Sequence, residues 1–102
     1  MKVVPALAAL GDKSRLEIVT KLCRNGPQSI VRLSDGAGIS RQGVTKHLHA
    51  LRRAGLARSE RHGRERIWKL EPKRFEDVRR YLAQISAQWD DTLARLKSAV
   101  EE

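Results

Sequence analysis

Apolar residues recur every three or four positions along most of the chain, which is the spacing of helices that bury one face. The first such stretch predicts a short helix that ends at Gly11. Asp12 then suits the N-cap of a second helix that runs to about Arg24, because its side chain can accept a hydrogen bond from a free backbone N–H. We expect the core-facing positions of this second helix to be Leu16, Val19, Leu22 and Cys23.

A helix-turn-helix is predicted over about residues 29–54. Its first helix begins near Ser29, and a second helix follows after a short turn that contains glycine. Ser40 is a good N-cap for this second helix. Gly55 is a good stop, because glycine readily takes the left-handed conformation that closes a helix. The pattern therefore places a well-delimited helix at the end of the pair.

This second helix divides into an apolar stripe and a polar face. The stripe consists of Val44, Leu48 and Leu51, which lie at i, i+4 and i+7. The opposite face presents Gln42, Lys46, His49 and Arg53, flanked by Arg41, Thr45 and Arg52. The face holds no acid, whereas a solvated helix usually mixes both signs of charge. Taken alone it is also compatible with a charged solvent face, but in this context we interpret it as a DNA-recognition helix.

After Leu56 the apolar period changes from about 3.6 to 2, which predicts a β-hairpin over about residues 56–70. The two strands are separated by His62 and Gly63, where glycine permits a tight reversal. Basic side chains crowd the tip and flanks of the hairpin: Arg58, Arg61, His62, Arg64 and Arg66. Charge of this kind also protects edge strands from aggregation. Directly after a recognition helix, however, a cationic hairpin is better explained as a wing that lies on phosphates.

A long last helix is predicted over about residues 72–100, with Pro72 in its first turn. Its apolar stripe contains Phe75, Val78, Leu82, Ile85, Trp89, Leu93, Leu96 and Val100. At about 1.5 Å per residue the helix is about 40 Å long, which exceeds the body of a domain of this size. Part of the stripe must therefore cover something else, and a second copy of the chain is the simplest candidate.

The composition agrees with a single small domain, residues 1–102, that binds a polyanion. The net charge is +9. Its distribution is uneven, with +3 in residues 1–40, +8 in residues 41–80 and −2 in residues 81–102. A basic excess confined to the block of the recognition helix and hairpin is typical of a phosphate-binding surface. A single cysteine, no membrane-spanning run and no signal-peptide pattern lead us to expect a cytoplasmic protein.

The order of helix, helix, helix-turn-helix, basic hairpin and long terminal helix is that of a winged helix-turn-helix, a mainly α fold with a small β-hairpin. Two segments, ALGDKSRLEIVTKL and ISRQGVTKHLHALRRAGLARSERHGRERIWKL, resemble the opening signature and the recognition helix and wing of the ArsR/SmtB family of small bacterial transcriptional repressors. The resemblance covers about residues 4–70 strongly and the last helix more loosely. It implies a homodimer that binds a palindromic operator in double-stranded DNA.

The resemblance also assigns roles to residues. Positions near DNA match Ser40, Arg41, Gln42, Thr45, Lys46 and His47 in the helix, and Arg61, Gly63 and Arg64 in the wing. From the helical angles, His47 lies at the flank of the polar face, so we expect His49 to be the better placed for groove contact, along with Arg53. The wing set is completed by His62 and Arg66. Pairing through the first and last helices implicates Leu7, Leu82, Ile85, Trp89, Leu93 and Leu96 in dimerisation.

The chain departs from the metal sensors of that family, which carry Cys-x-Cys-type ligands in the first helix of the helix-turn-helix or His, Asp and Glu ligands on the last helix. Residues 29–37 contain no Cys or His, and the last helix has no His. We therefore expect no metal and no other cofactor. No nucleophile, base and orienting group can be assembled either, so we expect no enzyme.

Three other functional interpretations stay open beside a sequence-specific dimeric repressor. The chain is also compatible with a nucleic-acid binder without sequence preference, or with a winged helix that binds a protein through the same face. The third is a thiol-responsive repressor that uses Cys23. For that residue a small buried core position is the competing interpretation, because free cysteine usually packs as a hydrophobe. Gln42, Thr45 and His49 favour the specific repressor, since base reading needs groups that discriminate.

Overall fold

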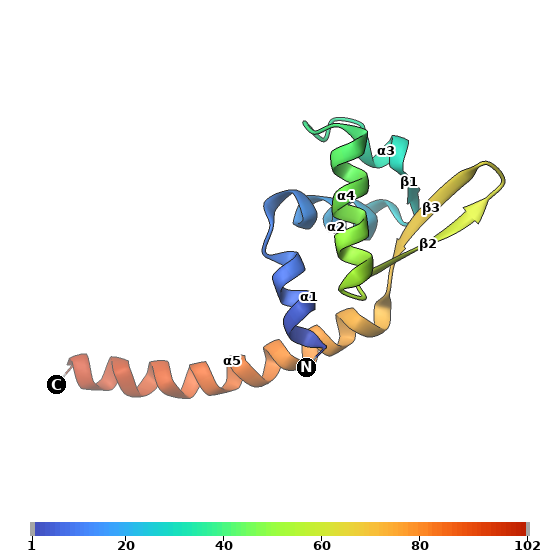
Figure 1. The fold of residues 1–102 in the computed structure, drawn as a ribbon. Helices are drawn as coiled ribbons and strands as arrows, with labels where there is room; N and C mark the ends of the chain where they lie inside the picture. The colour runs from blue at the N-terminus through green and yellow to red at the C-terminus, as the bar shows by residue number, and fades with distance from the viewer. Residues whose placement is uncertain (1, 102) are drawn as a thin grey trace.

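The computed structural model describes residues 2–101, which form five helices and a three-stranded sheet. The confirmed fold class is mainly helical, with a small antiparallel sheet and a long last helix (Figure 1). In chain order the elements are α1 (Val3–Leu10), α2 (Lys13–Asn25), β1 (Gln28–Ser29), α3 (Ile30–Ser34), α4 (Arg41–Arg53), β2 (Ala57–His62), β3 (Glu65–Leu70) and α5 (Pro72–Glu101).

Helix α2 begins as the sequence predicts but presents a different face to the core. Asp12 is the N-cap, and its carboxylate accepts a hydrogen bond from the backbone N–H of Arg15 at 3.0 Å. The buried residues are Ile18, Val19 and Leu22, whereas Leu16 and Cys23 are exposed. The core expectation for those two residues was wrong.

The reason lies in the helical step of about 100° per residue. The stripe is centred between Ile18 and Val19, so Cys23, one step beyond Leu22, points away from the core. The interpretation of Cys23 as a core residue is therefore wrong, and the thiol-responsive hypothesis remains untested.

Helices α3 and α4 form the helix-turn-helix. Ser29 caps α3 and Ser40 caps α4, each through its side-chain oxygen. At the other end of α4, the N–H of Gly55 donates to the carbonyl of Arg52 at 2.9 Å and that of Leu56 to Leu51 at 3.0 Å. Gly55 has a φ of 79°. These two bonds and the left-handed glycine make up a Schellman motif, so α4 is firmly delimited at both ends.

The sheet contains one strand more than the hairpin that the sequence predicts. Strands β2 and β3 form the hairpin, and the two-residue strand β1 pairs with β3 on its other side. Two residues are too few to show an alternating pattern, so β1 left no signal. At the centre of this sheet Trp68 is 1% exposed and lies opposite both Gln28 and Ser59. It anchors the hairpin to the core formed by the apolar sides of α2, α3 and α4.

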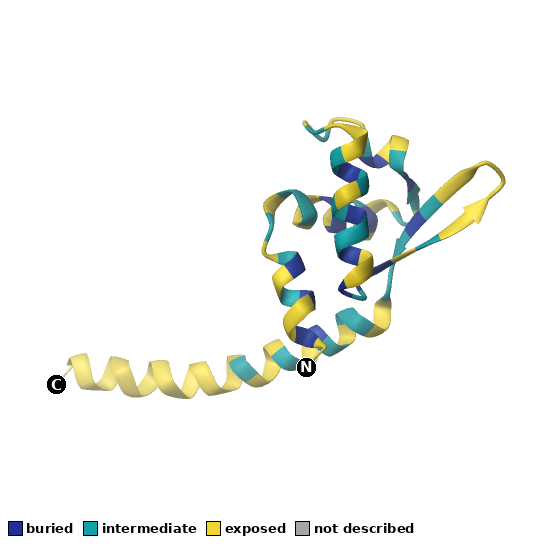
Figure 2. Cartoon of the chain, in the orientation of Figure 1, coloured by how far each residue is buried: buried dark blue, intermediate teal, exposed yellow. Residues whose placement is uncertain are grey.

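Helix α5 runs away from the body of the molecule, as Figures 1 and 2 show. Its first turns pack beside α1 and bury Val78. Further along, Leu82, Trp89, Leu93 and Leu96 are exposed, with 65% of Trp89 accessible. The chain extends 65 Å along its longest axis but only 27 and 21 Å along the other two. The outer half of the predicted stripe thus has no cover within the described part of the chain.

Candidate nucleic-acid interface

The outward face of α4 is a cationic surface without acids. Val44, Leu48 and Leu51 are fully buried on the opposite side, so the helix cannot rotate without exposing its core face. The exposed residues include Arg41, Gln42, Lys46, Arg52 and Arg53. Within residues 2–101, no carboxylate lies within 4.0 Å of any of the four cations of this helix. Their charges are thus available to an external anion.

The first two turns of α4 hold two small polar side chains in fixed positions. The Oγ of Ser40 accepts a hydrogen bond from the N–H of Gly43 at 3.1 Å, as an N-cap does. One turn later, the hydroxyl of Thr45 donates to the carbonyl of Arg41 at 2.8 Å. That bond uses the hydroxyl hydrogen, so Thr45 presents an acceptor oxygen and a methyl group to its surroundings.

The two histidines of α4 lie on opposite flanks of the polar face. His49, which we expected to be well placed for groove contact, is half-buried. Its ring meets the ring of Trp68, a residue of β3, edge-on. His47 lies on the flank that faces the start of α2, where its charge helps to lower the pKa of Asp12. The sequence could not show this difference, because helical angles alone do not place the sheet.

The hairpin has two faces of different charge. Cross-strand register puts Ala57, Ser59 and Arg61 on one face with their partners Leu70, Trp68 and Arg66. This is the face that packs on α4 through Trp68, and we call it the inner face. Arg61 lies directly opposite Arg66, although like charges in that position destabilise a sheet. Neither guanidinium has an acidic partner among the residues that the structure describes; Arg61 donates to the Gly63 carbonyl and Arg66 to the Ser59 hydroxyl.

The outer face of the hairpin is neutralised by Glu60. Its carboxylate lies 2.6 Å from Lys69, 3.5 Å from His62 and 3.9 Å from Arg58. The hydrogen bond and charge of Lys69, followed by the weaker effects of His62 and Arg58, hold the pKa of Glu60 below its usual value. Arg58 also bonds to Glu71 at 2.7 Å. The basic residues of the predicted wing therefore fall into two groups. Arg58 and His62, on the outer face, already have carboxylate partners, whereas Arg61 and Arg66, on the inner face, do not.

The turn of the hairpin carries the remaining two residues of the predicted wing. Gly63 has a φ of 65°, which suits the first position of a two-residue hairpin turn. Arg64 follows it at the exposed tip. With Arg61 and Arg66 it forms a group of three arginines at the far end of the hairpin, on the inner face and the tip.

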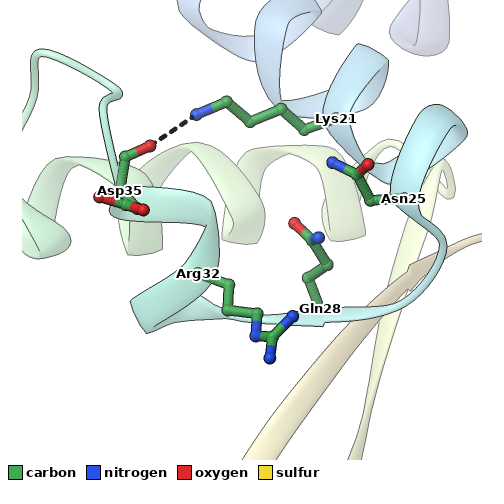
Figure 3. Close-up of a pocket in the computed structure, with 5 residues that line it drawn as sticks. All are labelled: Lys21, Asn25, Gln28, Arg32 and Asp35. Carbon is green, nitrogen blue, oxygen red and sulfur yellow. Dashed lines mark hydrogen bonds between the residues drawn. The ribbon is translucent and has the colours of Figure 1, made fainter.

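A polar hollow of about 450 Å³ lies between α2, β1 and α3 (Figure 3). It is lined by Lys21, Asn25, Gln28, Arg32 and Asp35. The ammonium of Lys21 donates to the carbonyls of Leu33 at 3.2 Å and Asp35 at 3.3 Å, so it closes the C-terminal end of the short helix α3. Three elements contribute to this hollow, which is why no local pattern in the chain predicts it. The ammonium of Lys21 is thus occupied in holding α2 to α3.

Two further geometric findings concern other kinds of site. In the described range, no three His, Cys, Asp or Glu side chains come close enough together to hold a metal ion. No helix of residues 2–101 has the length and apolar character needed to cross a bilayer.

A helix-turn-helix with an acid-free second helix, followed by a hairpin with a basic inner face, defines the winged helix class of nucleic-acid-binding proteins. Comparison with known proteins narrows the class. Residues 10–60 match the family model described as a helix-turn-helix domain. Over 69 residues the chain is 38% identical to the HTH-type transcriptional regulator NmtR of Mycobacterium tuberculosis, an alignment that covers 68% of this chain and 57% of that protein.

Solved structures agree. An ArsR-like transcriptional regulator from Rhodococcus sp. RHA1 superposes with a TM-score of 0.76 and 37% identity, covering 95% of this chain and 91% of that one. The winged helix-turn-helix DNA-binding domain of Mb0332 from Mycobacterium bovis, described as homodimeric, gives 0.66 and 25% identity over 90% and 82% of the two chains. The chain belongs to the ArsR family of DNA-binding transcriptional regulators, which confirms the resemblance seen in the sequence.

Proposed function

We propose that the chain is a homodimeric repressor that binds a palindromic operator, reading bases with the first turns of α4 and gripping phosphates with the inner face of the hairpin. The observation that carries this proposal is the pair Arg61 and Arg66. Two like charges directly opposite each other, without an acid, cost stability unless an anion is bound there. They share the face of the hairpin that packs on α4, so one DNA duplex can reach both elements.

Base reading is assigned to the outward side chains of the first turns of α4, chiefly Gln42, Thr45 and Lys46. An α-helix fits the major groove, where each base pair presents a different set of donors and acceptors. An exposed Gln42 has both a donor and an acceptor to offer, and Thr45 has a methyl and an acceptor oxygen. Ser40, Arg41 and His47 lie beside this group and are proposed to contact the DNA backbone, whereas His49 is left out.

The homodimer is supported by α5 and by relatives. The exposed stripe of Leu82, Trp89, Leu93 and Leu96, continued by the half-buried Ile85, needs a cover of its own length. Leu7 is half-buried on α1, the helix that packs beside α5. The M. bovis relative is described as homodimeric. A twofold dimer presents two α4 helices related by symmetry, and an operator with the matching palindrome uses both. We infer repression from the resemblance to ArsR/SmtB repressors. It requires that the dimer, when bound to its operator, block a promoter.

The test compares variants of the two elements on two kinds of DNA. The operator is first selected from random duplexes with the wild-type protein, and binding is then titrated on it and on random DNA at several salt concentrations. Gln42→Ala should weaken operator binding by about 1–3 kcal/mol and leave random DNA unchanged. Arg61→Ala should weaken both, and should lower the salt slope by about 0.9 for each phosphate that the variant no longer binds, or about 1.8 in a dimer.

The matched control for Arg61 is Arg58→Ala, which removes the same side chain from the same strand but from the outer face, where it is paired with Glu71. It should leave the salt slope nearly unchanged. Equal effects of Gln42→Ala and Arg61→Ala on both DNAs would mean that the surface is only electrostatic, and the binder without sequence preference would be the correct interpretation. If the wild-type protein bound no DNA at all, specific or random, the protein-binding interpretation would replace both DNA-binding interpretations.

A further inference from the structure

Arg74, in the first turn of α5, holds the C-terminal end of the recognition helix. Its Nη1 donates to the carbonyl of Ala54 at 3.2 Å, at the C-cap of α4. The guanidinium also lies directly over Gly55: a Cβ built on that glycine would be 2.8 Å from Cζ of Arg74. A cation beside the last carbonyls of a helix is favourable, because the helix dipole is negative at that end. Only glycine leaves room for it here.

The side chain of Arg74 also contacts the residue directly before α1 and a second residue of its own helix, α5. Nη1 lies 3.4 Å from the carbonyl of Lys2, directly before α1, and Nε lies 3.9 Å from Oδ2 of Asp77, one turn further along α5. The side chain is 23% exposed, so its bonds are partly protected from water. A planar guanidinium can direct several N–H groups at once, which a lysine ammonium on a flexible stem does less rigidly. Arg74 thus joins α1, α4 and α5 at one point.

The inference rests on the proposed function. Arg74 lies where the proposed dimer helices meet the proposed reading helix. Helices α1 and α5 form the proposed dimer contact, and α4 is the proposed reader. Helix α4 is about 20 Å long, so a rotation of about 10° about its C-terminal end moves its N-terminal end by about 3.4 Å, the rise of one base pair. We propose that Arg74 is a positioning residue that fixes the angle between α4 and the dimer helices, and thereby sets the spacing of operator half-sites that the dimer accepts.

The experiment measures spacing preference, which a residue with a merely structural role would not change. The probes are the palindromic duplex selected by the wild-type protein, derivatives with its centre lengthened or shortened by one and two base pairs, and a duplex with a single half-site. Wild-type affinity should fall at least about tenfold with a change of two base pairs. Arg74→Ala should bind the single half-site normally but discriminate among the spacings by less than about threefold.

Arg79→Ala is the matched control. Arg79 is an exposed arginine of the same helix whose bonds, to Glu76, stay within α5, so its loss should leave the wild-type spacing profile intact. Circular dichroism and normal binding to the single half-site show that a variant is folded. If Arg74→Ala does not fold, Arg74→Lys keeps the charge without the planar fork and should also flatten the profile.

The outcomes separate the inference from the function beneath it. A wild-type protein without spacing preference would overturn the palindrome-binding dimer, and with it the role of Arg74. A wild-type preference that Arg74→Ala or Arg74→Lys retains in full would overturn the role of Arg74 alone. If both variants unfold, Arg74 serves folding and not positioning, and the inference is wrong.

Discussion

The ring of His49 meets the ring of Trp68 edge-on, with centroids 5.7 Å apart and an interplanar angle of 86°. Arg52, one turn further along α4, places its guanidinium carbon 5.9 Å from the centre of the same indole ring. Trp68 is therefore covered by two polar residues of the recognition helix. These contacts hold the hairpin against α4, and they fix the direction in which the inner face of the hairpin extends.

We expect His49→Ala to loosen this contact. Edge-to-face aromatic pairs contribute about 0.5–1.5 kcal/mol beyond the area that they bury, so the free energy of unfolding should fall by about 1 kcal/mol in urea titrations. The preferred operator sequence should not change. Lys46→Ala, at an exposed position of the same helix, is the control and should change the free energy of unfolding by less than about 0.5 kcal/mol. Unchanged stability, together with weaker discrimination at one base pair, would show instead that His49 reads a base.

The contrast between His49 and the rest of α4 shows how far the sequence could lead. The caps of α4, its buried stripe and its acid-free face all follow from local rules, because each depends on residues within one or two turns. The position of His49 depends on where β3 packs, and no local rule contains that. The same applies to Cys23, whose exposure is decided by which side of α2 meets α4 and β3.

Gly43, within α4, and Gly55, just beyond its C-terminal end, offer a test with opposite signs. Gly55→Ala forces a residue with a Cβ to a φ of 79° and displaces the guanidinium of Arg74, so it should lower the free energy of unfolding by about 1–3 kcal/mol. Gly43 lies within α4, and a Cβ there would meet its nearest neighbour, Ser40 Oγ, at an ordinary 3.5 Å. Gly43→Ala should therefore raise the free energy of unfolding by about 0.5–1 kcal/mol. Thermal denaturation of the two variants checks both signs, and a shift of both in the same direction would contradict these backbone assignments.

The cap of α2 predicts a specific response to acid. The hydrogen bond from the N–H of Arg15, followed by the charges of Arg15 and His47, lowers the pKa of Asp12 from its usual 3.8. A carboxyl whose pKa is lower in the folded state stabilises the fold above its usual pKa, and this contribution disappears as the pH falls through the lowered value. Asp12→Asn keeps a capping oxygen but does not titrate.

Wild type should therefore melt at a higher temperature than Asp12→Asn at neutral pH, and the difference should shrink as the pH falls from about 5 to about 2. Glu60→Gln serves as a comparison in a different part of the fold, because Lys69 lowers the pKa of Glu60. Its melting temperature should approach that of the wild type over the same fall in pH. Parallel melting curves of wild type and Asp12→Asn over this range would contradict an ionised cap.

The distribution of charge over the two faces of the hairpin is a second feature that the sequence alone did not predict. The alternation of residues along β3 puts Arg66 and Trp68 on one side of the strand, but alternation alone does not show that Glu60 neutralises the other side. That result depends on the register of β2 against β3, which aligns Arg61 with Arg66 and brings Glu60 within reach of Lys69. A one-residue shift of register would exchange the two faces.

The exposed stripe of α5 predicts the last outcome, the dissociation of the dimer. Burying a leucine side chain contributes about 1.5–3 kcal/mol, and a twofold contact counts each position twice. Replacing Leu93 and Leu96 together with Glu should therefore yield monomers in sedimentation equilibrium, because it removes this contribution and puts four carboxylates into an apolar contact. The control adds the same charges to the opposite side of the helix, as Ala94→Glu with Ser98→Glu, and should remain dimeric. Because the substituted residues lie beyond the turns that pack on α1, the monomer should keep its fold and bind a single half-site. A dimer that survives the leucine replacements would place the contact elsewhere and leave the stripe without a partner.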